Sequence, residues 1–395
     1  MNLYRRYPAR APEWFGEDEI RRAAAYRRPL RRAGLLQAIL GLGVNAAVVA
    51  TAAGPRLAGV LEAGDWRLGT VLVASGLTLA SGALGLPFSA WRQLVHERRW
   101  GFNRQSPGGF LADAAKSVGL SLVFADVAVL GLWALMRTTR WWWLAGWVGA
   151  VILMVLLGFL APVALAPIFN RFRPLGDAEL VGPAEELSRR AGVRVSRFLV
   201  MDASRRTAKH NAYFSGLGRT KRVVLSDTLL KDFDRSSILV ILAHELGHWR
   251  RRHVPLGIVG ASALMLPGFL VLYRLLAWEP IRDWAGIDGA GDPGSVPLVV
   301  LALSIMQAAV SPLQLWVSRA WERRADLDAV ELTGDPASFV RMERELALKN
   351  LSELAPGRLG YLLASHPPAP ERIALATAAA PQRHRSRGKP HNFLV

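Results

Sequence analysis

Six long apolar runs, separated by charged segments, dominate the pattern of hydrophobic and polar positions along the chain. Each run contains neither Lys nor Arg. A helix needs roughly 20 apolar residues to cross the hydrocarbon core of a bilayer, so the pattern predicts a mainly α-helical, polytopic membrane bundle with six transmembrane helices. The predicted spans are residues 34–54, 68–88, 117–136, 141–166, 254–273 and 296–318.

The polar segments divide the chain into further parts. Before the first span, residues 1–33 form a basic cytosolic segment, which we interpret as a helix at the membrane surface that is solvated and serves as an orientation signal. The remaining predicted parts are four spans joined by a cytosolic loop at 89–116 within 34–166, an extramembrane part at 167–253, a membrane hairpin at 254–318, a second extramembrane part at 319–376 and a basic, disordered tail at 377–395.

Both extramembrane parts show regular patterns. The first begins with a helical pattern at 177–192, and short β-rich runs bounded by Gly and charged residues predict a small sheet. The second consists of helical segments, the first of which continues from the last span. The β-rich runs are residues 197–202, 211–218 and 221–227, and the helical segments of the second part are residues 319–332, 336–354 and 365–376.

The net charge of +18 at pH 7 is distributed unevenly along the chain. If the N-terminus is cytosolic, only six of the 49 Lys and Arg lie in external loops, which is the positive-inside bias. The charge therefore indicates topology and contact with anionic membrane lipid, and not nucleic acid. We expect a multi-pass protein of the inner membrane with both termini in the cytosol, and the excess of Arg over Lys together with abundant Ala is typical of a high-GC bacterium. Residues 1–33 are too charged for a cleavable signal peptide.

A short helix in the first extramembrane part carries the candidate chemistry. Asp234 is a suitable N-cap for it, and the roughly 15 residues before an Arg cluster are too few to span a bilayer. We therefore expect this helix at the cytosolic edge, with its apolar half against the bundle. Its sequence His-Glu-Leu-Gly-His at 244–248 places His244 and His248 on one helical face, where both can bind one divalent ion.

Glu245 lies about 100° around the helix from His244, within reach of a water activated by that ion. A carboxylate in this position can act as general base, which is why this motif is typical of metalloproteases. Cys is absent from the chain, so any metal must be held by His and carboxylates. The pattern predicts one Zn²⁺ per chain.

A catalytic zinc needs a third protein ligand. The first carboxylates that return to the same side of the membrane are Glu322 and Asp326, which lie on one face of the segment after the last span. Glu322 suits the ligand and Asp326 suits a partner that orients an imidazole. Spacing alone leaves open that these are ordinary solvated helix residues.

Several blocks of the chain resemble the Ste24-type CAAX prenyl proteases of the M48 zinc metallopeptidases. They are HERRWGFNRQSPGGFLAD (96–113), APIFNRFRPL (166–175), NAYFSGLGRTKRVVLSDTLL (211–230), HELGHW (244–249), ERRAD (322–326) and SHPPAPERI (365–373). The resemblance implies a zincin-like catalytic domain built from residues 167–253 and 319–376, with zinc held by His244, His248 and Glu322.

The resemblance also implies roles that spacing alone does not give. Asn211 and Ala212 correspond to an edge strand that binds an extended substrate peptide through its backbone. His366 corresponds to a histidine near the metal that stabilises the oxyanion or regulates the open position, and Arg372 to the arginine that accompanies it. His253 corresponds to a further histidine, which we interpret as structural.

The function predicted from these residues is an integral membrane zinc endopeptidase acting on peptides or proteins from the cytosolic side. One alternative is a quality-control protease of the HtpX type, and another is a non-catalytic membrane scaffold that keeps a vestigial zinc site. The oligomeric state is left open by the sequence.

The remaining ionisable residues carry weaker signals. Asp126 lies within a predicted span, where an ionisable group either lines a polar interior or bonds to a neighbouring helix. The remaining histidines are expected at the surface. They are His96, His210, His384 and His391.

Overall fold

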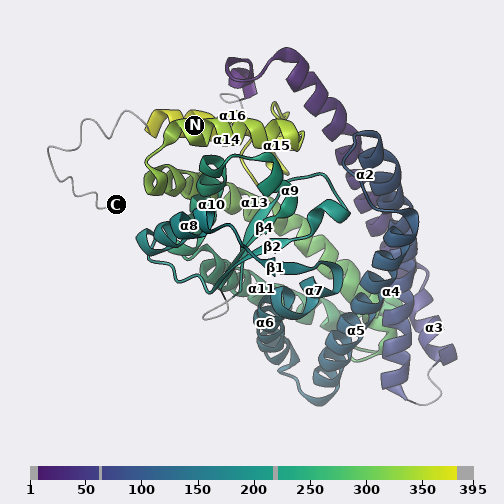
Figure 1. Ribbon diagram of the computed structural model, residues 1–395. Coiled ribbons are helices and arrows are strands. Elements are labelled where there is room, and N and C mark those ends of the chain that lie inside the picture. The colour runs from purple at the N-terminus through teal and green to yellow at the C-terminus, as the bar shows by residue number, and fades with distance from the viewer. Residues whose placement is uncertain (1–7, 62–64, 217–220, 380–395) are drawn as a thin grey trace. The chain divides into compact units, whose positions relative to one another are not determined.

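A computed structural model describes residues 8–61, 65–216 and 221–379 of the chain (Figure 1). The chain forms two compact units. Unit 1 consists of Met1–Pro29, Gly158–Pro255 and Pro312–Val395, and unit 2 consists of Leu30–Leu157 and Leu256–Ser311.

Six helices in the described part of the chain are long and apolar enough to cross a membrane. The predicted fold class, a helical membrane bundle with a small sheet, is therefore confirmed. Turns of π-helix extend two of these helices at Trp91–Glu97 and Ala161–Leu165, and the second continues into α7, Ala166–Phe169. The long helices are α2 (Glu17–Ala50), α4 (Trp66–Ala90), α5 (Pro107–Thr138), α6 (Trp142–Leu160), α11 (His253–Ala277) and α13 (Val296–Thr333).

The other helices of the described chain are short. A separate helix α3 follows α2, because the chain turns at Ala52 with a positive φ of 48°. Three 3-10 turns lie at Pro8–Glu13, Ala203–Arg205 and Pro293–Ser295. The short α-helices are α3 (Ala53–Leu61), α8 (Ala178–Arg190), α9 (Asp227–Asp232), α10 (Arg235–Arg250), α12 (Glu279–Ala285), α14 (Pro336–Lys349), α15 (Arg358–Leu362) and α16 (Ala369–Ala379).

The N-terminal segment forms the predicted helix with largely exposed basic side chains, but one side of it is packed, which the sequence analysis did not predict. Phe15 and Ala23 are buried in one apolar cluster with Leu354 and Ile373 from the C-terminal region. Arg27 also donates hydrogen bonds to the carbonyl groups of residues 350 and 351. This packing could not be predicted from the sequence, because the few apolar positions that make the contact are surrounded by Arg residues. The predicted disordered tail lies outside the described residues from position 380 onward.

Unit 1 contains a four-stranded sheet in the order β1-β2-β4-β3. The strands are β1 (Phe172–Pro174), β2 (Arg197–Met201), β3 (Ala212–Ser215) and β4 (Arg222–Ser226). β2 and β4 are parallel, and the two outer strands run antiparallel to their neighbours. β3 is thus an edge strand. β1 was not predicted, because its three residues include a proline and show no alternation.

Helix α10 packs inside unit 1. Its N-cap prediction is confirmed, because the Asp234 side chain accepts a hydrogen bond from the Ser237 backbone N–H. Leu242 and Leu246 of α10 are buried in one cluster with Leu180 of α8 and Phe339 of α14. The expectation that the apolar half of α10 lies against the membrane bundle stays a prediction, because these contacts are within unit 1. The amphipathic helices α8 and α14, the sheet and the C-terminal part of α13 supply apolar surface to α10 within the same unit.

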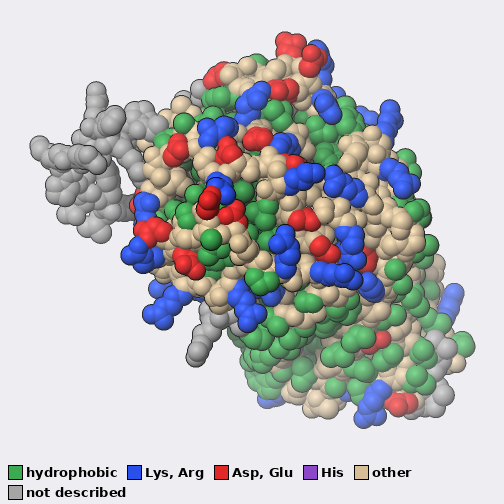
Figure 2. Space-filling view, viewed as in Figure 1, with side chains coloured by type: hydrophobic (Ala, Val, Ile, Leu, Met, Phe, Trp, Pro, Cys, Tyr) green, Lys and Arg blue, Asp and Glu red, His purple; other side chains and the backbone are tan. Residues whose placement is uncertain are grey.

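Unit 2 has a separate apolar core that includes Trp133, Trp142, Leu272 and Leu276. Hydrophobic side chains also gather on its outer face over α5 and α6 (Figure 2), as expected for helices in contact with lipid. Asp126 of α5 is half-buried and accepts hydrogen bonds from the Ser75 hydroxyl of α4, at 3.1 and 2.9 Å. Of the two roles left open for Asp126, the bond to a neighbouring helix is the one observed.

The packing of the N-terminal segment predicts the effect of truncating Phe15, whose exposed fraction is 2%. Removal of a buried aromatic ring costs about 3 kcal/mol or more, so Phe15→Ala should lower the thermal midpoint of the detergent-solubilised protein. Leu359→Ala is the matched control, because Leu359 is 56% exposed and its truncation should leave the midpoint nearly unchanged. Equal midpoints for Phe15→Ala and Leu359→Ala would show that this packing does not contribute to stability.

Candidate metal centre

Two helices of unit 1, α10 and the C-terminal part of α13, approach each other closely at Gly247. A Cβ atom built on Gly247 would lie 3.1 Å from the Asp328 Cβ and 3.2 Å from the Ala325 Cα. Few side chains would fit this contact, so the glycine of the motif allows the two backbones to approach. Arg251, just after α10, also makes two hydrogen bonds to the Asp328 carboxylate of α13, at 2.5 and 2.9 Å.

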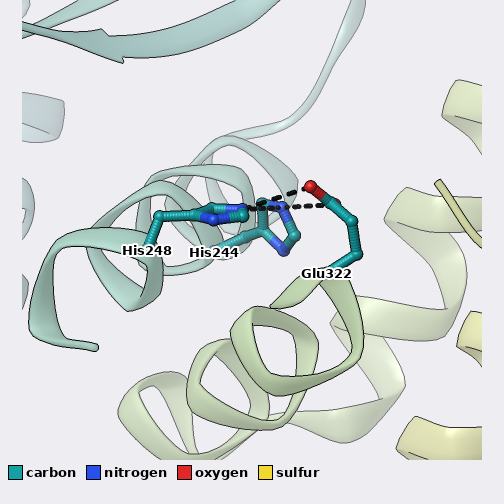
Figure 3. A group of neighbouring side chains, drawn as sticks. All are labelled: His244, His248 and Glu322. Atoms are coloured by element: carbon teal, nitrogen blue, oxygen red, sulfur yellow. Dashed lines mark hydrogen bonds and ion pairs between the residues drawn. The ribbon is translucent and has the colours of Figure 1, made fainter. Parts of the chain in front are cut away.

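This approach brings His244, His248 and Glu322 together (Figure 3). The two imidazoles project from successive turns of α10 toward the carboxylate on α13. The Nε2 atoms of His244 and His248 are 3.2 Å apart. The carboxylate oxygens of Glu322 lie 3.3 Å from His244 Nε2 and 3.5 Å from His248 Nε2.

The three side chains are close enough together to hold one metal ion. Bonds of about 2.0–2.1 Å to a tetrahedral ion place the ligand atoms about 3.3–3.4 Å from one another. Glu322 Oε2 is buried and accepts no hydrogen bond from the described residues, and only His244 Nε2 lies at ion-pair distance from it, at 3.3 Å. A bound cation would satisfy this buried oxygen. Two imidazoles and one carboxylate form a ligand set that zinc commonly adopts in catalytic sites.

The ligand His244 is oriented by Asp326, which lies one turn beyond Glu322 on α13. His244 Nδ1 is 2.9 Å from an Asp326 oxygen, and this contact leaves Nε2 directed toward the other ligands. Arg372 of α16 makes two hydrogen bonds to the same carboxylate, at 2.9 and 2.5 Å. Arg372 also pairs with the buried Glu343 of α14, at 2.7 Å.

The electrostatic environment differs between the two imidazoles. Burial acts to lower the pKa of His244, but its contacts with Asp326 and Glu322 outweigh burial and raise the pKa to about 10. A cation that binds at Nε2 therefore displaces a proton. Burial lowers the pKa of His248 to about 4, so this imidazole is neutral at pH 7 and has a lone pair available for a metal.

Glu245 lies on α10 between the two histidines, and its carboxylate is directed by the edge strand. The backbone N–H of Phe214 in β3 donates a hydrogen bond to Glu245 Oε2, at 3.2 Å. Burial raises the pKa of Glu245 to about 7, although neighbouring His244 acts to lower it. The carboxyl group is therefore poised to exchange a proton near neutral pH.

Asn211 and Ala212 lie at the start of β3, the edge strand. The Asn211 carbonyl accepts a hydrogen bond from the Ser226 N–H, and the Asn211 N–H donates to the Ser226 hydroxyl. The backbone N–H and C=O groups of successive residues in a strand point in opposite directions. Since the backbone groups of Asn211 face β4, those of Ala212 and Phe214 point away from β4. The hydrogen bond from the Phe214 N–H to Glu245 agrees with this direction. The open edge of β3 is therefore beside the general-base candidate.

His366 lies next to the metal ligands, in the connection between α15 and α16. Its Nε2 is 3.4 Å from a Glu322 oxygen, while 61% of its side chain is exposed. Within the described residues, the cluster of ligand atoms that could hold a metal comprises only His244, His248 and Glu322. His366 is thus a largely exposed imidazole close to Glu322, one of the candidate ligands.

His253, which the sequence analysis interpreted as structural, contacts a candidate ligand, whereas Glu343 was missed and two other histidines were misplaced. His253 lies with its Nδ1 3.0 Å from His248 Nδ1, and its ring stacks on Trp321. Glu343 gave no signal, because its helix shows an ordinary charged pattern. The prediction that His96 and His210 lie at the surface is wrong, since their exposed fractions are 7% and 8%. The other two histidines expected at the surface, His384 and His391, lie outside the described residues.

Comparisons with known proteins relate the whole described chain to one family. The family model described as "Peptidase family M48" matches residues 174–380. A second, described as "CAAX prenyl protease N-terminal, five membrane helices", matches residues 1–171. The described residues of this N-terminal match contain four candidate spans.

Individual proteins are similar over most of the chain. An uncharacterized metalloprotease, YhfN of Bacillus subtilis, is 32% identical over 301 residues, which cover 75% of this chain and 70% of the relative. A CAAX prenyl protease 1 homolog of Arabidopsis thaliana is 30% identical over 332 residues, 81% of this chain and 75% of the relative. The crystal structure of S. mikatae Ste24p has the same fold, with a TM-score of 0.82, 22% identity and coverage of 95% of this chain and 94% of that chain.

The contact between Asp326 and His244 predicts a dependence of metal affinity on Asp326. Loss of a carboxylate that orients a ligand histidine weakens metal binding by about 10–100-fold, so Asp326→Asn should raise the zinc dissociation constant by that factor in competition with a chelator. Glu331→Gln is the matched control, because Glu331 is an exposed carboxylate on the same helix. An unchanged zinc affinity in Asp326→Asn would remove Asp326 from the metal centre.

Proposed function

Because this chain belongs to peptidase family M48 and is a membrane metalloendopeptidase of the Ste24 type, we propose that it hydrolyses peptide bonds with one Zn²⁺ ion held by His244, His248 and Glu322. The observation that supports this proposal is the convergence of the two imidazoles and the Glu322 carboxylate. The two Nε2 atoms are 3.2 Å apart, and the two carboxylate oxygens lie 3.3 Å from His244 Nε2 and 3.5 Å from His248 Nε2. The 3.2 Å between the two nitrogens is close to the about 3.3–3.4 Å that separates two ligands of a tetrahedral zinc ion. Asp326, itself held by Arg372, orients His244.

The bound ion would activate a water and polarise the peptide carbonyl. Glu245 takes the proton of the attacking water and transfers it to the departing amine, so the same carboxyl group acts first as base and then as acid. The Phe214 N–H holds the Glu245 carboxylate in one orientation. His366 donates a hydrogen bond to the oxygen that becomes negative during the attack, which is its proposed contribution to catalysis.

The substrate peptide binds in extended form along the open edge of β3. The backbone groups of Ala212 pair with the peptide backbone, as in other complexes that add a strand to a sheet. Asn211 precedes this position and offers its exposed side chain to the same peptide. Pairing through the backbone fixes the position of the scissile bond relative to Glu245 without requiring one particular substrate sequence.

The substrate class and location follow from the same features. Several relatives are named CAAX prenyl proteases, so prenylated peptides with a C-terminal CAAX motif are included among the proposed substrates. The distribution of Lys and Arg supports an inner membrane protein of a bacterium with both termini in the cytosol. Neither a quality-control protease of the HtpX type nor a non-catalytic scaffold is favoured, because the chain matches peptidases of the Ste24 type throughout.

The general-base role of Glu245 predicts the phenotype of Glu245→Gln. This change keeps the size of the side chain but removes the proton acceptor, so cleavage of a peptide panel, with and without prenyl groups, should fall by about 10²-fold or more. Zinc content should remain one ion per chain. Glu185→Gln, which alters an exposed carboxylate, should retain full activity. If Glu245→Gln cleaves peptides at the rate of the unaltered protein, Glu245 is not the base.

The pKa of Glu245 predicts a pH dependence. Burial raises this pKa to about 7, and a divalent cation nearby acts in the opposite direction by favouring the carboxylate. Because the base must be deprotonated, kcat/KM should decrease as the pH falls through an apparent pKa below about 7. Zinc content measured at each pH separates this effect from metal loss. Activity that increases on acidification contradicts the assignment.

A further inference from the structure

Arg319 of α13 is a buried cation to which neither the metal centre nor the proposed reaction assigns a role. Its exposed fraction is 2%, and within the described part of the chain no carboxylate lies at ion-pair distance from it. A buried charge is costly unless it is hydrogen-bonded or paired. The partners of Arg319 therefore indicate what its burial achieves.

The guanidinium binds the connection that carries His366. Arg319 Nη1 donates hydrogen bonds to the carbonyl oxygens of Leu362, at 3.3 Å, and Ala364, at 2.6 Å. The hydroxyl of the preceding residue, Ser318, donates to the carbonyl of Ser365, at 2.8 Å. Consecutive residues of α13 thus bind three carbonyl groups within the four residues that precede His366.

The position of the guanidinium is itself fixed. Its Cζ lies 5.0 Å from the centre of the Tyr361 ring, within the range of a cation–π contact. The Tyr361 hydroxyl donates to Glu371 at 3.0 Å and accepts a hydrogen bond from Arg323 at 2.8 Å. Tyr361 is therefore held from both sides and provides a rigid surface for Arg319.

The same helix carries the metal ligand that His366 contacts. Glu322 lies one turn after Arg319, and its carboxylate is 3.4 Å from His366 Nε2. The connection itself holds Pro367 and Pro368, which lack an N–H and cannot anchor the segment by donating backbone hydrogen bonds. The segment is held by backbone hydrogen bonds at its two ends, by the Ser365 hydroxyl on His366 Nδ1 at 2.8 Å, and by the contacts with α13, which tie it to the helix that carries Glu322.

We propose that Arg319 is a positioning residue that fixes His366 against the metal centre by binding the carbonyl groups of Leu362 and Ala364. Arg319 does not touch the substrate. This inference rests on the proposed function, because it assumes that His366 contributes to peptide hydrolysis. It adds the reason for burying a cation in this place and predicts that the effect of Arg319 on activity passes through His366.

The test uses the full-length protein with Arg319→Met, and with Arg319→Lys as the conservative variant. Arg324→Met is the matched control, because Arg324 lies on the same helix and is exposed. We expect Arg319→Met to retain one zinc per chain and to show a kcat/KM that is lower by about 10-fold to 10²-fold. The larger factor is the effect of losing an oxyanion donor altogether. Arg319→Lys keeps a donor and should restore part of the activity.

A double-mutant cycle separates positioning from a general loss of structure. If Arg319 acts through His366, Arg319→Met should cause little further loss in kcat/KM when it is added to His366→Ala. The proposal would be overturned if the loss in the double variant equals the product of the losses in Arg319→Met and His366→Ala. It would also be overturned if Arg319→Met is as active as Arg324→Met.

Hydrogen exchange distinguishes a failure of this inference from a failure of the proposed function. Amides of residues 360–366 should exchange faster in Arg319→Met than in Arg324→Met, whatever the activity. If exchange is faster in Arg319→Met but His366→Ala is fully active, His366 does not contribute to catalysis. In that case Arg319 has no catalytic residue to position, and the inference is refuted as well. Unchanged exchange in Arg319→Met would refute the contact itself.

Discussion

The structure of the site depends on the close approach of α10 and α13 at Gly247. A side chain at Gly247 would press against Asp328 and the backbone of Ala325, so only a glycine permits the observed separation without movement of the neighbours. Glu322 lies one turn before Ala325 and reaches both imidazoles because the helices are this close. Since the ligands come from segments separated by a membrane hairpin, this contact joins two distant parts of the chain.

Buried charges organise the surroundings of the metal ligands. Asp326 is 1% exposed and is held by both His244 and Arg372, while Arg372 is in turn paired with Glu343. Burial raises the pKa of Glu343 to about 7, although the charge of Arg372 acts to lower it. Four helices, α10, α13, α14 and α16, each contribute one residue to this network. Removal of Arg372 would leave the buried Glu343 without its ion-pair partner and Asp326 with only His244, which is expected to be destabilising.

Much of the fold and part of the site could be predicted from the sequence. Length and hydropathy gave six spans, and the β-rich runs gave β2, β3 and β4, because these signals are local. The packing of Phe15 against Ile373 and the burial of His210 against Asp232 and Asn350 could not be predicted, because they depend on contacts between segments that are distant in sequence. From spacing alone, Glu322 could be a zinc ligand or an ordinary solvated helix residue. The position of His366 near the metal was predicted only from the resemblance to Ste24-type proteases. Arg319 gave no signal, since a buried arginine and a solvated one have the same local pattern.

The central claim is that α10 and α13 together hold one zinc ion through two imidazoles and one carboxylate. Zinc K-edge X-ray absorption of the purified protein tests it most directly. The account predicts a four-coordinate ion with two imidazole nitrogens and light-atom ligands at about 2.0–2.2 Å, and a loss of this signal in Glu322→Ala. A spectrum without imidazole scattering, or one that is identical in Glu322→Ala, would contradict the claim.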